Sequence, residues 1–242
     1  MNRITGKLGD WLADPTVWDA EKITHCFDVI ESAKSGSDCY TLEAIGKSAS
    51  HLAYRCLDGL LPADMEPQAF EAIQWAKDHA RTTGRETAMH QTRWVGSITM
   101  ALAYITILRR GGKDLGAKLC VEIINESAVK ALPQNAVNIM RACVLRAARQ
   151  CALGEPTAAL ESVDLCHKIF RLAAAQFKFD KGSIMRGDEL IRMAKLVKIA
   201  IGIRNHCVEK PDPPVFPWQQ LAAIDTQQPF QSAFIAMGPK DK

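Results

Sequence analysis

The chain places a histidine directly beside a cysteine at three positions: His25-Cys26, Cys166-His167 and His206-Cys207. Imidazole and thiolate groups are common zinc ligands. Neighbouring residues on a helix point about 100° apart, so the two side chains of such a pair cannot easily face one ion. His167 also falls on the apolar stripe of its segment, where a core histidine bonded to a carbonyl or side chain is expected. We therefore predict no metal site and no cofactor.

Local motifs of nucleophilic catalysis and phosphate binding are absent from the sequence. There is no G-x-S-x-G, no G-x-x-x-x-G-K-[ST] and no D-D-x-x-D. His79 and His90 stand among charged residues that could line a cleft with acid–base chemistry: Asp78, Arg81, Arg85, Glu86 and Arg93. Such side chains at helix ends are usually solvated, so we predict no catalytic residue. Because a site built from distant residues leaves no local motif, an all-α enzyme stays open as a third alternative.

Two sets of basic residues have the spacing of an anion-binding or partner-binding surface. Arg192, Lys195 and Lys198 fall between two apolar stripes, one of Leu190, Met193, Ala194, Val197 and Ile201 and one of Leu196, Ile199 and Ile203. The second set is Arg141, Arg146 and Arg149. Nucleic acid would gain counterion release on such strips. Lysine stems that cover an apolar helix give the same pattern, and aromatic residues for base stacking are missing. Both interpretations stay open.

Residues 208–242 form a tail rich in proline and aromatic residues, with six of the chain's 11 prolines. Proline at this density excludes a continuous helix. Its candidate recognition residues are Phe216, Trp218, Phe230 and Phe234. Exposed aromatic side chains are costly unless something covers them. The tail is therefore predicted to be irregular and either to fold back over the body or to bind a partner.

Positions 1–207 are predicted to form a single all-α domain, because helix periodicity and helix-end signals recur without strand patterns between them. About eight helices are expected, at 14–36, 38–59, 67–84, 86–110, 114–132, 134–151, 155–177 and 183–205. Asp14 with Pro15, and Asp38, are the expected N-terminal caps of the first two. The most hydrophobic run, 94–108, is shorter than the ~20 residues of a membrane span, so we expect a buried helix and no membrane.

Two junctions, 110–117 and 152–159, resemble one another, each with a glycine at the turn and a small residue, Ala117 or Ala159, after it. The second resembles a tetratricopeptide hairpin, with Ala147, Gly154, Ala159 and Cys166 at the family's small positions. The resemblance covers about residues 94–177. Gly112 and Gly154 are 42 positions apart, rather than the family's ~34, and its large aromatics and closing proline are missing. The resemblance implies stacked antiparallel hairpins in a solenoid-like arrangement, and a compact helical bundle is the alternative.

Charge is unevenly distributed along the chain. Residues 1–80 carry 7 Lys/Arg and 13 Asp/Glu, a net of −6, whereas residues 81–242 carry 23 and 14, a net of +9. The eight cysteines are scattered and form no C-x-x-C, which favours reduced core residues and a cytoplasmic protein. We expect a non-catalytic scaffold or adaptor with a protein partner. A nucleic-acid-associated subunit is the alternative, and the oligomeric state is left open.

Overall fold

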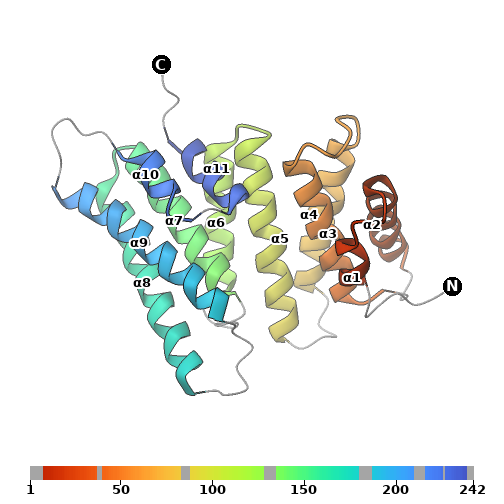
Figure 1. Cartoon of the computed structure of the whole chain (residues 1–242), viewed down its shortest axis with the longest axis horizontal. Helices are drawn as coiled ribbons and strands as arrows, with labels where there is room; N and C mark the ends of the chain where they lie inside the picture. The colour runs from red at the N-terminus through yellow and green to blue at the C-terminus, as the bar shows by residue number, and fades with distance from the viewer. Residues whose placement is uncertain are drawn as a thin grey trace.

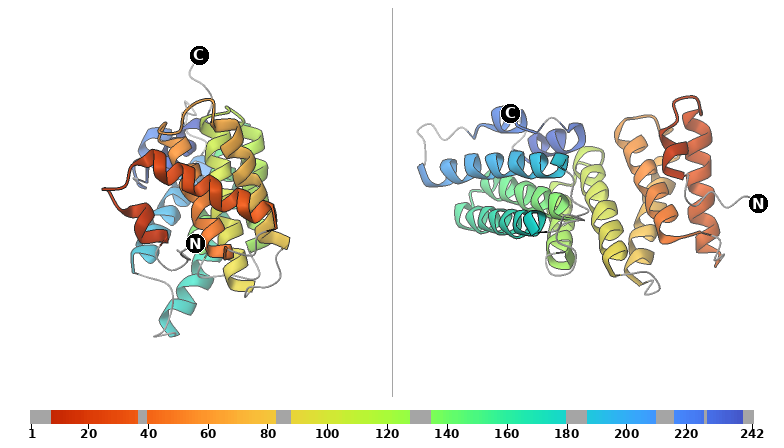
Figure 2. Two further views of the ribbon diagram at one scale, coloured as in Figure 1. Left: turned by 90° about the vertical axis from the view of Figure 1, so that its right-hand side faces the viewer. Right: turned by 60° about the horizontal axis from the view of Figure 1, so that its bottom comes forward.

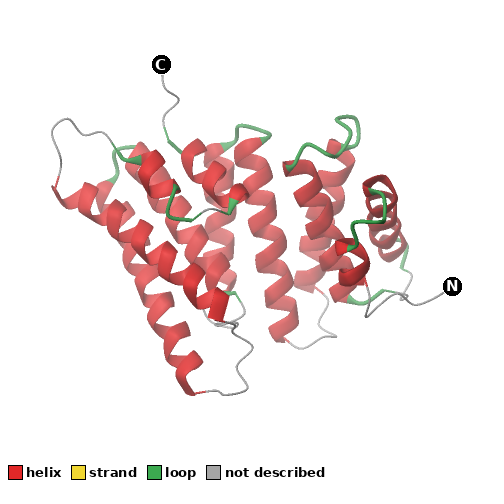
Figure 3. Cartoon of the chain, viewed as in Figure 1, coloured by secondary structure: helices red, strands yellow, loops and turns green. Residues whose placement is uncertain are grey.

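The computed structural model describes residues 8–36, 40–82, 88–127, 135–179, 187–209, 216–225 and 227–238. Within these ranges the regular structure is helical and no strand occurs, which confirms the predicted all-α fold (Figure 3). The described helices are α1 (Leu8–Ala13), α2 (Asp19–Lys34), α3 (Leu42–Leu57), α4 (Glu66–Thr82), α5 (Ala88–Leu108), α6 (Lys113–Ser127), α7 (Ala136–Ala152), α8 (Pro156–Phe179), α9 (Gly187–Glu209), α10 (Trp218–Ala222) and α11 (Gln228–Ala236).

The helices are arranged in a row that follows the order of the chain. Each helix from α2 to α9 packs against the next, and α3, α5, α7 and α9 also contact one another in turn. Figure 1 shows α2 at one end of this row and α8 with α9 at the other. This pattern of contacts is that of αα-hairpins packed side by side, since short connections make consecutive helices neighbours.

The glycines predicted where helices end more accurately than the aspartates predicted where helices begin. The turn between α7 and α8 passes through Gly154 with φ +76°, a left-handed conformation that only glycine adopts without strain. The predicted caps were less accurate. Asp14 accepts hydrogen bonds from the backbone N–H and hydroxyl of Thr16 and so organises a turn, while α2 begins only at Asp19. Asp38 lies outside the described residues, and the side chain of Thr41 caps α3.

The predicted buried helix is α5, which runs through the middle of the row. Ile98, Leu102 and Ile105 are at most 2% exposed, and α5 contacts α3, α4, α6 and α7. A helix surrounded in this way needs apolar residues on every side, as the sequence suggested. Among the described residues, no helix combines the length and apolar character needed to cross a bilayer.

The tail packs on the body and contains two short helices where irregular chain was expected. Helix α11 contacts α5 and α7, and α10 contacts α9. The right-hand view of Figure 2 shows these two helices and α8 on opposite sides of α7 and α9. Two of the tail's prolines start helices, since Pro217 is the N-cap of α10 and Pro229 stands in the first turn of α11, where the missing N–H costs nothing. The Lys113 ammonium donates a hydrogen bond to the carbonyl of Gly238, the last described residue of the tail.

Candidate functional site

The arginines predicted as one basic set on α7 do not share a surface. Arg141 is buried, with 8% of its surface exposed, and its guanidinium lies 5.8 Å from the centre of the Phe230 ring. Arg149 instead faces α6, where it forms an ion pair of 2.8 Å with Asp114. Arg146 is half-buried. A continuous phosphate-binding strip along α7 therefore does not form.

The second basic set, on α9, is also less regular than its spacing suggested. The buried face of α9 is a single one, formed by Met193, Leu196, Ile199, Ala200, Ile203 and Cys207. Ile201, predicted to be buried, is 43% exposed, so the strip does not lie between two buried flanks. Arg192 pairs with Asp188 at 3.4 Å, Lys195 is half-buried and Lys198 is exposed. The two apolar stripes in the sequence predicted two buried faces on this helix, but the structure has only one.

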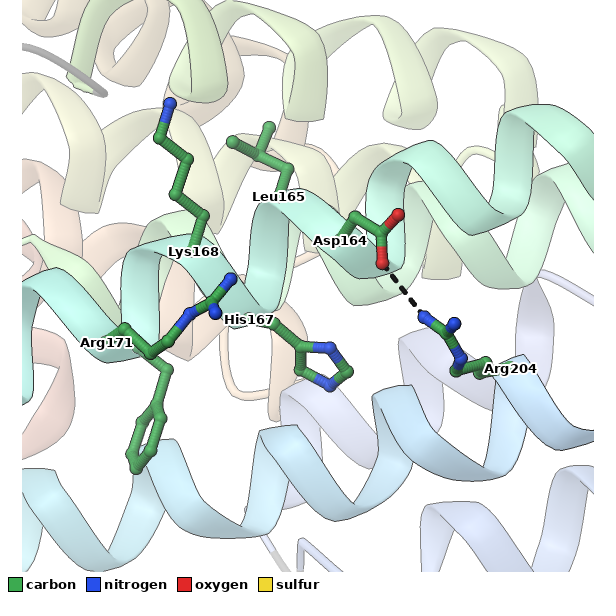
Figure 4. Close-up of a pocket in the computed structure, with 7 residues that line it drawn as sticks. Asp164, Leu165, His167, Lys168, Arg171 and Arg204 are labelled. Carbon is green, nitrogen blue, oxygen red and sulfur yellow. Dashed lines mark hydrogen bonds and ion pairs between the residues drawn. The ribbon is translucent and has the colours of Figure 1, made fainter.

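A wide cleft lies between α8 and α9. It has a volume of about 870 Å³ and is lined by Asp164, Leu165, His167, Lys168, Phe170, Arg171 and Arg204. Figure 4 shows His167 extending from α8 toward α9, whereas Lys168 projects from another side of α8. Arg204 of α9 donates to the carboxylate of Asp164 at 3.0 Å. Three cations against one carboxylate make this cleft basic.

His167 was predicted to be a core histidine, and this is wrong. The side chain is only half-buried and lines the α8–α9 cleft, and its Nε2 atom has no hydrogen-bond partner among the described residues. Burial lowers the pKa of His167, with Asp164 acting in the opposite direction and Arg204 in the same direction. Burial is the main influence on the pKa of this imidazole, and its Nε2 atom is itself buried.

The four tail aromatics form one cluster against the body instead of an exposed motif. Phe230 and Phe234 are 1% and 0% exposed, and Trp218 lies 5.5 Å from Phe234 between ring centres. Phe216 lies 4.3 Å from Trp218 and 4.9 Å from the ring of His206 on α9. These ring pairs have the offset and tilted geometry that aromatic side chains prefer. Of the two predicted alternatives for the tail, this arrangement matches the one in which it folds back over the body.

A second, smaller cavity lies where the tail meets the body, and sequence reasoning missed it. It has a volume of about 320 Å³ and is lined by Tyr54, Tyr104, Arg141, Gln227, Gln228, Pro229 and Phe230. Arg141 and Phe230 were both singled out from the sequence, but as members of separate surfaces. Their meeting depends on the docking of α11 against α5 and α7, and no local spacing in the sequence reports such a long-range contact.

The histidine–cysteine pairs have structural surroundings. His25 packs edge-on against Trp11 at 5.0 Å, and the neighbouring Cys26 is buried. Within the described ranges no three histidine, cysteine or acidic side chains come close enough to hold a metal ion. The Sγ atoms of Cys151 and Cys207 lie 3.2 Å apart between α7 and α9. Burial raises the pKa of Cys151, and its contact with Cys207 raises it further, so this thiol is a poor nucleophile at neutral pH.

The charged residues around His79 make structural contacts. His79 stacks on Trp75 at 4.6 Å between ring centres. Arg81 reaches Glu122 of α6 at 2.9 Å and Asp78 at 3.4 Å. Arg85 and Glu86 lie outside the described residues, as do the side chains of His90 and Arg93. Arg81 therefore connects α4 to α6, whereas the printed contacts of His79 and Asp78 lie within α4.

No protein-family model matches the chain, and no curated protein or solved structure shows significant similarity to it. The functional proposals therefore rest on the α8–α9 cleft, on the cavity beside the tail and on the surfaces around them.

Proposed function

We propose that this protein is a non-catalytic helical scaffold that holds an acidic segment of a protein partner in the cleft between α8 and α9. The observation that carries the proposal is the charge of that cleft. Lys168, Arg171 and Arg204 outnumber the one carboxylate, Asp164, in its lining. Basic side chains around a cleft favour an acidic partner and speed its association through long-range attraction.

Apolar side chains beside the cleft support a protein partner in preference to a free anion. Ile201 and Val208 are 43% and 61% exposed. They stand three residues before and four residues after Arg204, so on helix α9 the three share one face. An amphipathic acidic helix would cover the two apolar side chains and pair its carboxylates with Arg204 and Arg171. Interfaces commonly combine apolar contacts with a charged rim in this way.

The architecture is compatible with this role. Helices packed as successive hairpins present long, continuous surfaces, which is how repeat proteins bind extended partners. The tetratricopeptide resemblance of residues 94–177 implies the same kind of function. A cytoplasmic location is part of the proposal, supported by cysteines that are unpaired throughout the described part of the chain.

Site-specific photo-crosslinking in cells of the native host tests the proposal. A photoreactive phenylalanine analogue replaces Ile201, beside the cleft, or Leu60, a 50% exposed apolar residue that follows α3 and serves as the control. We expect a discrete protein adduct from position 201 only. Combining it with Arg171→Glu and Arg204→Glu should abolish the adduct. Equal adducts from both positions, or none from position 201, would contradict the proposal.

The nucleic-acid alternative is supported by the exposed Lys198 and the half-buried Lys195 beside it on α9. It predicts salt-sensitive binding at ~50 mM salt that weakens in the triple variant Arg192→Glu, Lys195→Glu, Lys198→Glu. A scaffold predicts no appreciable nucleic-acid affinity in either protein. A helical circular-dichroism spectrum of the triple variant is the control, because lysine stems also cover apolar surface.

A further inference from the structure

The small cavity between the tail and the body is a partly open site lined by both apolar and polar side chains. Its walls come from α3, α5 and α7 on one side and from residues 227–230 on the other. Tyr54, which is 42% exposed, marks its open side. At about 320 Å³ the cavity stands at the lower end of the range of about 300–1,000 Å³ that is typical of small-molecule sites.

Arg141 supplies a buried cation with unused hydrogen-bonding capacity. The side chain is 8% exposed, and its Nε and Nη2 atoms find no hydrogen-bond partner among the described residues. More than about 90% of buried polar groups in folded proteins are hydrogen-bonded, so two unpartnered donors on one side chain are unusual. Nε and Nη2 form one edge of the guanidinium, and that edge matches the two oxygens of a carboxylate.

Tyr104 adds a third donor to the same cavity. Its ring is 2% exposed, and its hydroxyl has no hydrogen-bond partner in the described part of the chain. Burial raises the pKa of Tyr104 well above its usual value, and the positive charge of nearby Arg141 opposes that shift only in part. The hydroxyl therefore keeps its proton and can donate it to an anion.

Asp225 forms a long ion pair with Arg141 at the Nη2 end of this edge, and its Oδ2 atom has no hydrogen-bond partner among the described residues. The carboxylate is 1% exposed, and its Oδ2 atom lies 3.9 Å from Arg141 Nη2, which is too far for a hydrogen bond. Its Oδ1 atom accepts from the backbone N–H of Gln227 at 3.2 Å. Asp225 does not line the cavity. It holds both the guanidinium and the loop that begins α11.

We propose that this cavity binds a small organic carboxylate, with its carboxylate on the Nε–Nη2 edge of Arg141 and its apolar part against Phe230, Pro229 and Tyr54. A carboxylate carries a single negative charge, and it would share the Arg141 guanidinium with Asp225. Inorganic phosphate carries a charge of about −1.5 to −2 and gains nothing from aromatic walls. The site shares no residue with the α8–α9 cleft, so a failure of this proposal would not count against the scaffold role, nor the reverse.

Calorimetric titration of the full chain with three probes tests the site. Phenylacetate has both required parts, phenylacetamide replaces its carboxylate with a neutral amide, and inorganic phosphate lacks the apolar part. We expect phenylacetate to bind with a dissociation constant of about 1 mM or tighter. Phenylacetamide and phosphate should bind at least about tenfold more weakly. Equal binding of acid and amide, better binding of phosphate, or no phenylacetate binding at concentrations of about 10 mM would each overturn the proposal.

Variants assign the binding to named atoms. Arg141→Gln should weaken phenylacetate about tenfold or more, and Tyr104→Phe, which removes only a hydroxyl, about fivefold. Arg149→Gln is the matched control, because that arginine lies on the same helix but pairs with Asp114 away from the cavity. Circular dichroism checks that each variant is folded. If Arg141→Gln does not fold, Tyr104→Phe decides alone, and an unchanged dissociation constant in that variant would refute the site.

Discussion

Truncation of Phe234 to alanine tests whether the tail belongs to the folded body. Phe234 is 0% exposed, and the rings of Phe216, Trp218 and Phe230 surround it at centre distances of 6.4, 5.5 and 6.2 Å. A buried aromatic side chain removes about 150–250 Å² from water. At about 25 cal/mol per Å², this corresponds to roughly 4–6 kcal/mol, an upper bound because the unfolded chain is partly compact.

Phe234→Ala should therefore lower the free energy of unfolding by about 3–5 kcal/mol, the range measured for such truncations in protein cores. The loss reaches this size only if α11 unfolds together with α5 and α7. If the tail were held weakly, it would detach in the variant, and the loss could not exceed the free energy of docking. The magnitude therefore reports how strongly the tail is attached.

Urea unfolding followed by far-UV circular dichroism measures this difference. A shift of the midpoint with an unchanged slope indicates one cooperative unit that contains the tail. Ile235→Ala is the matched control, because this neighbour on the same helix is only half-buried and should cost about 1 kcal/mol. A loss below about 1 kcal/mol for Phe234→Ala would refute the reasoning and favour a tail that binds in trans.

Three further perturbations have definite expected results. Burial, with help from nearby Arg55 and Lys22, lowers the pKa of His51 to about 4. As the pH falls, His51 therefore takes up a proton in the unfolded chain before it does so in the folded protein. The free energy of unfolding, measured by urea titration, should fall as the pH drops from about 6.5 to 4, and it should fall less steeply in His51→Gln. Gly46→Ala should cost about 1–3 kcal/mol in the same assay, since the new methyl would lie 2.4 Å from the Trp94 ring. Glu122→Gln should cost about 1–3 kcal/mol, because the buried Lys77 ammonium loses its carboxylate 3.2 Å away.

Local periodicity was sufficient to predict the fold class but not the ends of the helices. The run 94–108 is apolar on most sides, and the structure buries most of it as the C-terminal part of α5. The N-terminal caps were harder, because aspartate and threonine can cap a helix or a tight turn equally well. Asp14 bonds to Thr16 and closes a turn, and only the three-dimensional path of the chain decides between those outcomes.

Candidate binding residues were predicted by type but not by arrangement. Charge patterns on one helix do not say which face a neighbour will cover, and α11 covers Arg141 from more than eighty residues further along the chain. Ile201 was predicted to be buried but is exposed, because its helix lies at the end of the row and has only one buried face. Both errors concern long-range packing, which hydrophobic periodicity within a single segment does not encode.

The tail is structurally part of the small cavity as well as of the core. Residues 227–230 supply more than half of the cavity's lining, and Phe230 closes the cavity while packing 6.2 Å from Phe234. A ligand that touches both the tail and Arg141 must bind the docked tail more tightly than the free one. Docking and binding are then linked, and each increases the other by the same factor. Loosening the tail through Phe234 should therefore weaken phenylacetate binding, although Phe234 does not line the cavity.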